Sequence, residues 1–258
     1  MVKKMIKSLD LGKEAIFPLI LKMSWPSIIA LTAMSIYNFI DTFWLARLSP
    51  QALAALTVCF PVQMIFAAIG VGTGTGAGSF SARMFGAGKI HEAQKTAGQI
   101  FFLSFFFGLI TIISVLFFGD AILISFGAFS EILPLCHDYL YVIVFSSPFL
   151  FFSMMSNYLL RVEGRPLLSM YVVLIASISS AVLDPLLIFG IGPFPRLGIK
   201  GAAFAAVFAQ CLAFMFSVYF IQLKSSKYEL KWKHLIPNIP TINSIFSTGL
   251  PSITINLV

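Results

Sequence analysis

Long apolar runs, separated by short polar connections, dominate the pattern of this chain. A membrane-spanning helix needs about 20 consecutive apolar residues, and six runs of roughly that length occur. They cover residues 23–45, 53–78, 98–118, 139–160, 166–190 and 201–223. These runs lack the alternation of membrane β-strands and are too long for them. The pattern therefore predicts an all-α membrane protein with a lobe of six transmembrane helices.

The pattern changes after the sixth run. Residues 224–243 are polar and predict a cytoplasmic linker, whereas residues 244–258 open a new apolar run. In that run Pro251-Ser252-Ile253 repeats Pro26-Ser27-Ile28 at an offset of 225 residues. Internal repeats are a common architecture of secondary transporters. We therefore interpret residues 1–223 as an N-terminal lobe and residues 244–258 as the truncated start of a second lobe.

Composition supports a membrane protein. Of 258 residues, 59% are hydrophobic and only 10% are charged, whereas about a quarter of a soluble domain is charged. The basic N-terminal segment is not followed by a short apolar core with a small-residue cleavage site, so we expect no cleaved signal peptide. The formal charge of +7 does not indicate nucleic acid, because the basic residues cluster between the apolar runs, where they meet anionic lipid.

The placement of the basic residues predicts the orientation. Of 17 Lys and Arg residues, all but three lie in the N-terminal segment, the second and fourth connections, and the stretch after the sixth run. The three on the opposite side are Arg47, Arg196 and Lys200. Positively charged loops stay in the cytoplasm. We therefore expect a multi-pass protein of the cell (inner) membrane with a cytoplasmic N-terminus.

Two acids, Asp41 and Asp184, lie inside the apolar runs. A charged group there costs roughly 2.5–3.5 kcal/mol on insertion scales, so its presence indicates a function. Both acids precede the outer ends of their runs by a few residues, which places both about 6–9 Å below those ends. Tyr139 opens the fourth run in the same layer, and Tyr37 and Asn38 lie one turn before Asp41. The sequence predicts a polar cluster inside an apolar lobe.

A series of short motifs runs along the chain in a fixed order. They are Pro26, Tyr37-Asn38, Asp41, Arg83-Met84-Phe85-Gly86-Ala87-Gly88, Ala93, Tyr139, Arg161-Val162-Glu163-Gly164-Arg165-Pro166, Leu183-Asp184-Pro185 and Gly198-Ile199-Lys200-Gly201-Ala202-Ala203. This ordered set resembles the motifs of the multidrug and toxic compound extrusion (MATE) family. The resemblance implies a twelve-helix fold of two six-helix lobes that exports drugs in exchange for Na⁺ or H⁺. This chain would supply the N-terminal lobe and the start of helix seven, and would lack the C-terminal six-helix lobe.

We expect Asp41 to be the main coupling carboxylate and Asp184 its partner, with Asn38, Tyr139 and Ser180 completing the site. Two carboxylates close together titrate as one unit, and a proton or a Na⁺ neutralises them. Some Na⁺-binding members of the family carry Asn at the position of Ser180 and Thr early in helix six. Here helix six opens with alanines instead. This departure favours H⁺ as the coupling ion and leaves Na⁺ open. Apart from the coupling ion, we expect no cofactor.

The substrate prediction rests on charge and aromatic character. Acids and aromatic walls suit amphipathic, often cationic drugs and toxic compounds. Tyr37 and Asn157 are candidate substrate-binding residues, although Asn157 is equally suited to a bond between helices. Pro26 and Pro185 each remove a helical hydrogen bond and predict kinks, either static or mobile.

Three alternative functions remain at this point. A lipid-linked precursor flippase of related fold would favour a cationic cavity, whereas the charges inside this lobe are acidic. An intramembrane enzyme would need a nucleophile–base pair or metal ligands within the runs, and no His, Lys or Arg lies there. We therefore expect a protein that is not an enzyme. A truncated half-transporter would be inactive or would have to dimerise.

Overall fold

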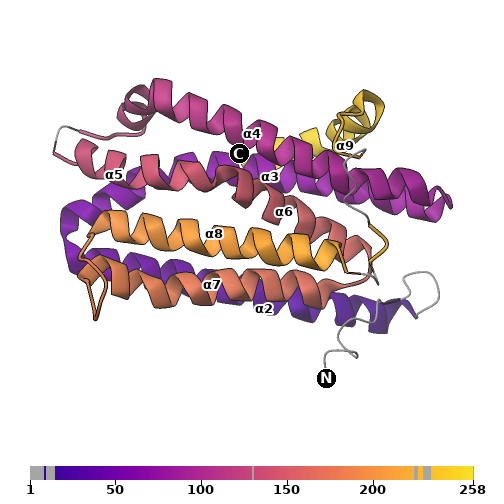
Figure 1. Cartoon of the computed structure of the whole chain (residues 1–258), viewed down its shortest axis with the longest axis horizontal. Coiled ribbons are helices and arrows are strands. Elements are labelled where there is room, and N and C mark those ends of the chain that lie inside the picture. Colours follow the sequence, from indigo (N-terminus) through magenta and orange to yellow (C-terminus); the bar gives the residue numbers. More distant parts are fainter. Residues whose placement is uncertain (1–8, 10–14, 130, 224–225, 229–233, 258) are drawn as a thin grey trace.

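A computed structural model describes residues 9, 15–129, 131–223, 226–228 and 234–257. Within them the chain forms α-helices joined by short connections (Figure 1). The helices are α2 (Ile16–Leu48), α3 (Pro50–Gly86), α4 (Ile90–Ser125), α5 (Leu133–Ile143), α6 (Ser147–Val162), α7 (Pro166–Phe189), α8 (Ile199–Ile221) and α9 (Ile239–Leu257), with a 3₁₀ turn at Val144–Ser146. The basic residues that precede position 15 (Lys3, Lys4, Lys7 and Lys13) lie outside the described residues, as do residues 224–225 and 229–233 of the predicted linker.

Residues that favour helix ends set several boundaries. Ser49 separates α2 from α3, and its Oγ accepts a hydrogen bond from the Ala52 amide at 3.0 Å, which is the usual way to cap a helix start. Pro50 occupies the first turn of α3, where its missing N–H costs nothing. At the other end of the lobe's fifth span, α7 stops at Gly190, whose φ of 72° favours glycine.

The fourth predicted span is two helices instead of one. The 3₁₀ turn Val144–Ser146 separates α5 from α6. Pro148, in the first turn of α6, cannot donate a hydrogen bond to the carbonyl of Val144. The amide and the hydroxyl of Ser147 both donate to that carbonyl instead. The carbonyl therefore keeps partners where the 3₁₀ turn interrupts the α-helix.

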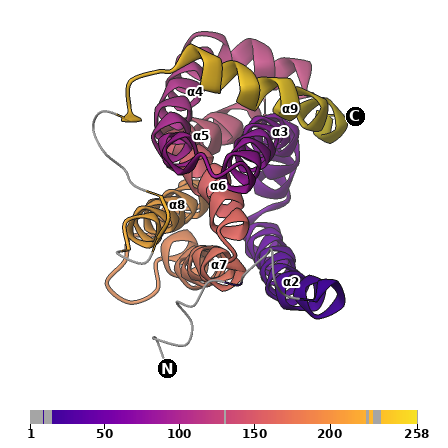
Figure 2. The same cartoon turned by 90° about the vertical axis from the view of Figure 1, so that its right-hand side faces the viewer.

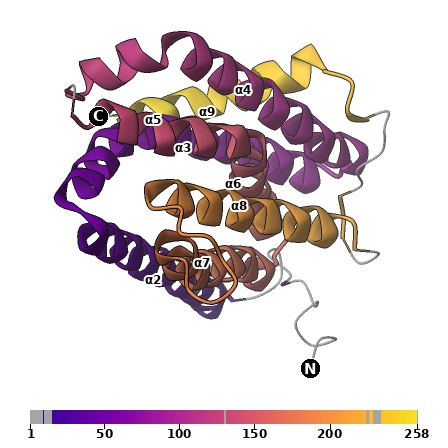
Figure 3. The same ribbon diagram turned by 60° about the vertical axis from the view of Figure 1, so that its left-hand side comes forward.

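The helices form two groups with α5 and α6 between them (Figure 2). The helices α2, α7 and α8 pack side by side in one group, and α3, α4 and α9 pack in the other (Figures 2 and 3). The connections α2–α3, α4–α5 and α7–α8 lie at one end of the bundle, which we name the Ser49 end (Figure 1). This arrangement places the ends of α2 and α7 and the start of α5 in one layer.

Large apolar side chains cover much of the surface, including Ile28, Phe117 and Phe208. Six helical stretches in the described part of the chain are long and apolar enough to cross a membrane, and α5 with α6 counts as one of them. Burying such a surface in lipid is favourable. The predicted fold class, an all-α lobe with six membrane-spanning segments, is confirmed.

Glycines let α3 pack closely on two sides. A Cβ placed on Gly74 would lie 2.6 Å from the ring of Tyr158 on α6. A Cβ placed on Gly76 would meet the carbonyl oxygen of Ile245 on α9 and would lie 3.0 Å from the amide of Gly249. Small residues permit such close contacts between helices in membranes. The structure therefore gives the glycine-rich part of α3 a packing role.

The helix that follows the linker begins earlier than expected. It starts at Ile239, so the last five residues of the predicted linker, 239–243, are helical. Asn238 caps this start, because its Oδ1 accepts hydrogen bonds from the Thr241 amide and hydroxyl, both at 3.0 Å. As in α2, which contains Pro26, a proline (Pro251) lies inside α9.

Candidate cation-coupling site

Asp41 and Asp184 lie on two helices that pack against each other. Asp41 lies on α2 and Asp184 on α7, and these helices pack along each other. Asp41 is 7% exposed and Asp184 is fully buried. The two carboxylates are close enough to interact electrostatically. The structure thus places both acids near the Ser49 end of the lobe, in the layer that residue counting predicts.

Two hydroxyl groups extend this cluster. The half-buried Tyr37, on α2, lies within electrostatic range of both carboxylates and beside Ser180 on α7. Ser180 is buried and precedes Asp184 by one helical turn. The neighbouring hydroxyls therefore belong to the same polar group as the two acids.

A second tyrosine closes the cluster from α5. Tyr139 is 3% exposed and lies within electrostatic range of Asp41 and Tyr37. Its hydroxyl accepts a hydrogen bond from Nε2 of Gln63 on α3, at 3.4 Å. Gln63 is a residue that sequence reasoning missed. The available signal was an amide within an otherwise apolar run, but nothing in its spacing ties it to Tyr139.

The cluster contains oxygens without hydrogen-bond partners. Among the described residues, none pairs with Oδ1 or Oδ2 of Asp184. The Ser180 Oγ lies beside Tyr37 but forms no hydrogen bond of normal geometry there. Buried polar atoms are costly unless something satisfies them. Protonation of a carboxylate or binding of a small cation would reduce that cost, so the arrangement suits either event.

The oxygen set also bears on Na⁺. The carboxylates of Asp41 and Asp184 and the hydroxyls of Tyr37 and Ser180 are hard oxygen donors, which suit such an ion. The buried start of α8 contributes Ala202 and Ala203, which have no side-chain oxygen. The two carboxylates are sufficient to bind a proton. A Na⁺ at the same place would have few oxygen ligands from the protein.

Two other predicted site residues are less buried than the acids. Asn38 is exposed, and its carbonyl accepts a hydrogen bond from the Thr42 hydroxyl at 2.8 Å. Asn157 lies on α6, where its Nδ2 donates to the Ser153 carbonyl at 2.9 Å. Its Oδ1 is buried and has no partner among the described residues. The structure thus separates Asn157 from the acidic cluster and turns Asn38 toward the surface.

The two prolines sit at different distances from the acids. Pro26 is buried inside α2, and fifteen residues of helix place it about 22 Å along the axis from Asp41. Pro185 follows Asp184 directly inside α7. Only Pro185 is therefore next to the acidic cluster.

Comparison with known proteins identifies the family. The family model described as MatE matches residues 26–186, which include Asp41, Tyr139 and Asp184. The chain belongs to the MatE family. This is the family of membrane transporters that the sequence motifs resemble, and it is not a family of enzymes. Membership agrees with the six helical stretches of the described chain that are long and apolar enough to cross a membrane.

Curated relatives in the MatE family differ in what they are named for. The chain is 35% identical to an FAD transporter from Shewanella oneidensis over 212 residues, which are 81% of the chain and 46% of that protein. It is 27% identical to the multidrug export protein MepA from Staphylococcus aureus over 248 residues, 95% of the chain and 54% of MepA. The chain thus spans about half the length of the curated relatives it matches.

Solved MATE-type structures share the fold. An outward-facing multidrug resistance MATE transporter matches 93% of the chain, with 29% identity and a TM-score of 0.85 over 52% of its own length. A MOP superfamily transporter from Pyrococcus furiosus, described as having a binding pocket of reversed polarity, gives a TM-score of 0.84 at 29% identity, with 93% and 52% coverage. An inward-facing MATE transporter gives 0.80 at 28% identity, with 89% and 53% coverage. The lobe therefore resembles both conformations.

Proposed function

We propose that this chain forms the cation-binding lobe of an exporter that moves amphipathic, often cationic compounds in exchange for H⁺ or Na⁺. The observation that carries the proposal is the buried pair Asp41 and Asp184, in which neither oxygen of Asp184 has a hydrogen-bond partner among the described residues. Acidic side chains inside membrane-spanning helices are costly, so their presence indicates a function. Family membership supports transport as that function.

Coupling requires that the ion bind one conformation better than the other. When the pair is neutralised, the dry packing of α2 against α7 is favourable. When it is charged, water or a cationic substrate must reach it. The likeness of the lobe to outward-facing and inward-facing structures fits a lobe that keeps its shape while it rocks against a second lobe.

H⁺ is the coupling ion that the donor set favours. Two carboxylates suffice to take up a proton, whereas a Na⁺ needs several oxygen ligands at once. Ser180 and Tyr37 supply hydroxyls, but the alanines at the start of α8 supply none. Orientation with a cytoplasmic N-terminus in the cell membrane is part of the proposal. Among the described Lys and Arg residues, Arg47, Arg196 and Lys200 lie near the Ser49 end, and the others lie toward the opposite ends of their helices or in the connections there.

A flavin dinucleotide is a second candidate substrate. It is favoured by the 35% identity to a protein named as an FAD transporter. The lobe also carries a cation on α6, one turn after Asn157: Arg161, whose Nε donates to the Ser169 hydroxyl at 3.3 Å and whose guanidinium lies over the Tyr158 ring at 5.7 Å. An Arg beside an aromatic ring suits a phosphate attached to a planar ring system.

Flux into vesicles separates these functions. The whole natural protein would be reconstituted, and uptake of ethidium and of FAD would be measured under a pH gradient and, separately, under a Na⁺ gradient. We expect ethidium flux driven by the pH gradient, and its loss in Asp41→Asn but not in Thr42→Val, an exposed neighbour. Flux of FAD alone would support the second candidate. Unchanged ethidium flux in Asp41→Asn would refute the assigned role of the acid.

A further inference from the structure

Gln99 makes three hydrogen bonds to the backbone that precedes α9. It lies on α4, is 1% exposed, and donates from Nε2 to the carbonyls of His234 and Ile236 at 2.8 and 2.9 Å. Its Oε1 accepts from the amide of Asn238 at 2.8 Å. One buried side chain thus satisfies three backbone groups of residues 234–238, a segment that we name the α9 lead.

The helix α4 is shaped to receive the α9 lead. A Cβ placed on Gly98, the neighbour of Gln99, would meet the backbone carbonyl of His234. Any larger residue at this position would push the segment away from α4. Gly98 therefore allows the backbone at His234 to approach α4, and the Gln99 amide forms a hydrogen bond to it there.

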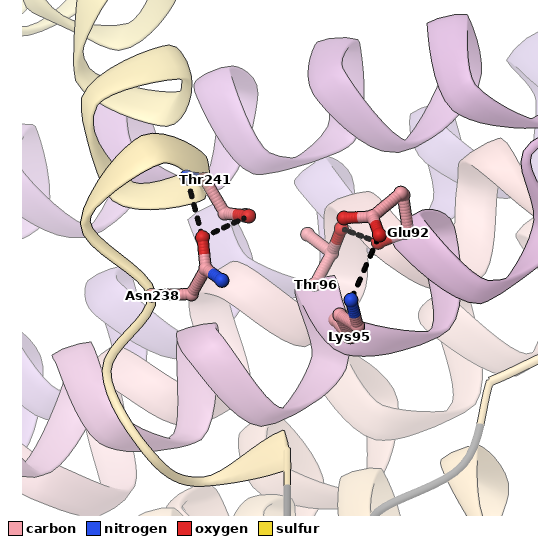
Figure 4. Close-up of polar contacts among 5 residues, drawn as sticks. All are labelled: Glu92, Lys95, Thr96, Asn238 and Thr241. Carbon is pink, nitrogen blue, oxygen red and sulfur yellow. Dashed lines mark hydrogen bonds and ion pairs between the residues drawn. The ribbon is translucent and has the colours of Figure 1, made fainter.

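The contact continues directly into α9. Asn238, whose amide is held by Gln99, also caps the helix through Thr241, and both residues lie beside α4 in Figure 4. Glu92 and Lys95 on α4 bond to each other at 2.8 Å, and the Thr96 hydroxyl bonds within α4 to the Glu92 carbonyl. The nearby charges are therefore paired with each other, and the neutral amide of Gln99 makes the bonds to the α9 lead.

Further along, α9 packs on α3 through backbone contact. Cβ atoms placed on Gly72 and Gly249 would lie 2.9 Å from the Ile253 amide and 2.6 Å from the Gly72 carbonyl oxygen, respectively. The α9 lead is therefore held by α4 through Gln99, and the later part of α9 packs on α3 through glycines.

We propose that Gln99 is a positioning residue that fixes the α9 lead to α4. The start of α9 then moves together with the first lobe and is not joined to it by a flexible connection. The inference rests on the proposed function only in assuming that the lobe moves during transport. If so, the backbone that bends during this motion follows the α9 lead and does not include residues 234–238.

Hydrogen–deuterium exchange of the whole purified protein tests the contact itself. The Asn238 amide bonds to Gln99, so Gln99→Leu should speed exchange in peptides covering 234–242 by at least about tenfold, since each lost bond shifts local opening severalfold. Peptides from α6 and α8 should keep their wild-type exchange, which reports that the lobe is folded. Thr96→Val, one turn away and equally buried, is the matched control and should leave 234–242 unchanged.

A pH profile separates a specific clamp from general packing. Gln99→Glu keeps the volume of the side chain. When protonated it can donate one hydrogen bond and accept another, but when ionised it sets a carboxylate against two carbonyl oxygens. We therefore expect protection of 234–242 in Gln99→Glu, corrected for intrinsic exchange, to fall as pH rises, with no such trend in wild type or Gln99→Leu. Failure of Gln99→Leu to speed exchange, equal acceleration in Thr96→Val, or a flat profile in Gln99→Glu would each overturn the proposal.

Transport measured on the same variants keeps the two proposals apart. Gln99→Leu should lower the maximal rate of ethidium flux at least about threefold, without changing the concentration for half-maximal flux, because Gln99 lies away from Asp41 and Asp184. The exchange results stand whether or not ethidium is a substrate. Loss of the clamp with an unchanged flux rate would refute its part in lobe motion.

Discussion

The tight contact between α3 and α9 gives a prediction that can be worked through from the coordinates. Replacing Gly76 by Ala adds one methyl group on the face of α3 that touches α9. That Cβ would meet the Ile245 carbonyl oxygen and lie 3.0 Å from the Gly249 amide and the Ile245 carbonyl carbon. All three are backbone atoms, so no flexible side chain can move aside.

Relief would require α3 and α9 to separate, and α3 cannot retreat easily. Two residues before, Gly74 holds α3 against Tyr158 of α6 on another face. Overpacking costs about 1–3 kcal/mol, and backbone contacts put this site at the upper end. Ala gains about 1 kcal/mol over Gly in helix propensity. The net loss for Gly76→Ala is therefore about 2 kcal/mol.

Thermal unfolding in detergent measures the effect. For a chain of this size, about 2 kcal/mol corresponds to a Tm lower by about 4–8 °C. The control is Gly86→Ala at the end of the same helix, where a Cβ has nothing within 4 Å. That variant should match or exceed the wild-type Tm. If Gly76→Ala proved as stable as Gly86→Ala, the direct backbone contact between α3 and α9 would be wrong.

Three further predictions concern buried polar groups. Asp184→Leu should raise stability by about 1–3 kcal/mol while abolishing coupled flux, because neither Asp184 oxygen has a hydrogen-bond partner in the described part of the chain; a loss of stability would indicate a structural role instead. Tyr228→Phe should cost about 1–3 kcal/mol in thermal unfolding, because it leaves the buried Ser81 hydroxyl without its 2.6 Å partner. Burial raises the pKa of Glu163, which lies between α6 and α7. Its contribution to stability is therefore greatest below its ordinary pKa and falls as pH rises through the raised pKa, and Glu163→Gln should flatten that part of the Tm–pH curve.

Hydrophobic pattern was sufficient to predict six apolar helical segments and the shared level of the two acids along the bundle. Counting residues from the helix ends placed Asp41 and Asp184 in one layer, because helical rise is constant. The pattern did not predict the direction of every neighbour. At 3.6 residues per turn, Asn38 lies about 60° from Asp41 around the helix and Tyr37 about 40° on the other side. The packing of α7 covers the Tyr37 side and leaves Asn38 exposed.

Features that depend on contacts between distant residues were missed. Gln63 meets Tyr139 across 76 positions of sequence, and Gln99 meets the α9 lead across more than 130. No local spacing encodes either pair. The early start of α9 was missed for the same reason, since its cap, Asn238, is held in place by Gln99. The break at Val144–Ser146 is a different case, because its signal, Pro148 inside the fourth apolar run, is local.

Infrared difference spectroscopy tests the central claim most directly, that Asp41 and Asp184 exchange a proton or a Na⁺ while buried inside the lobe. Protein reconstituted in lipid would be compared between acidic and alkaline pH, with and without Na⁺, in the region where protonated carboxyl groups absorb. The account predicts that Asp41→Asn and Asp184→Asn each remove part of the pH-dependent signal, whereas Thr42→Val leaves it intact. A signal unchanged by both aspartate substitutions would contradict the account.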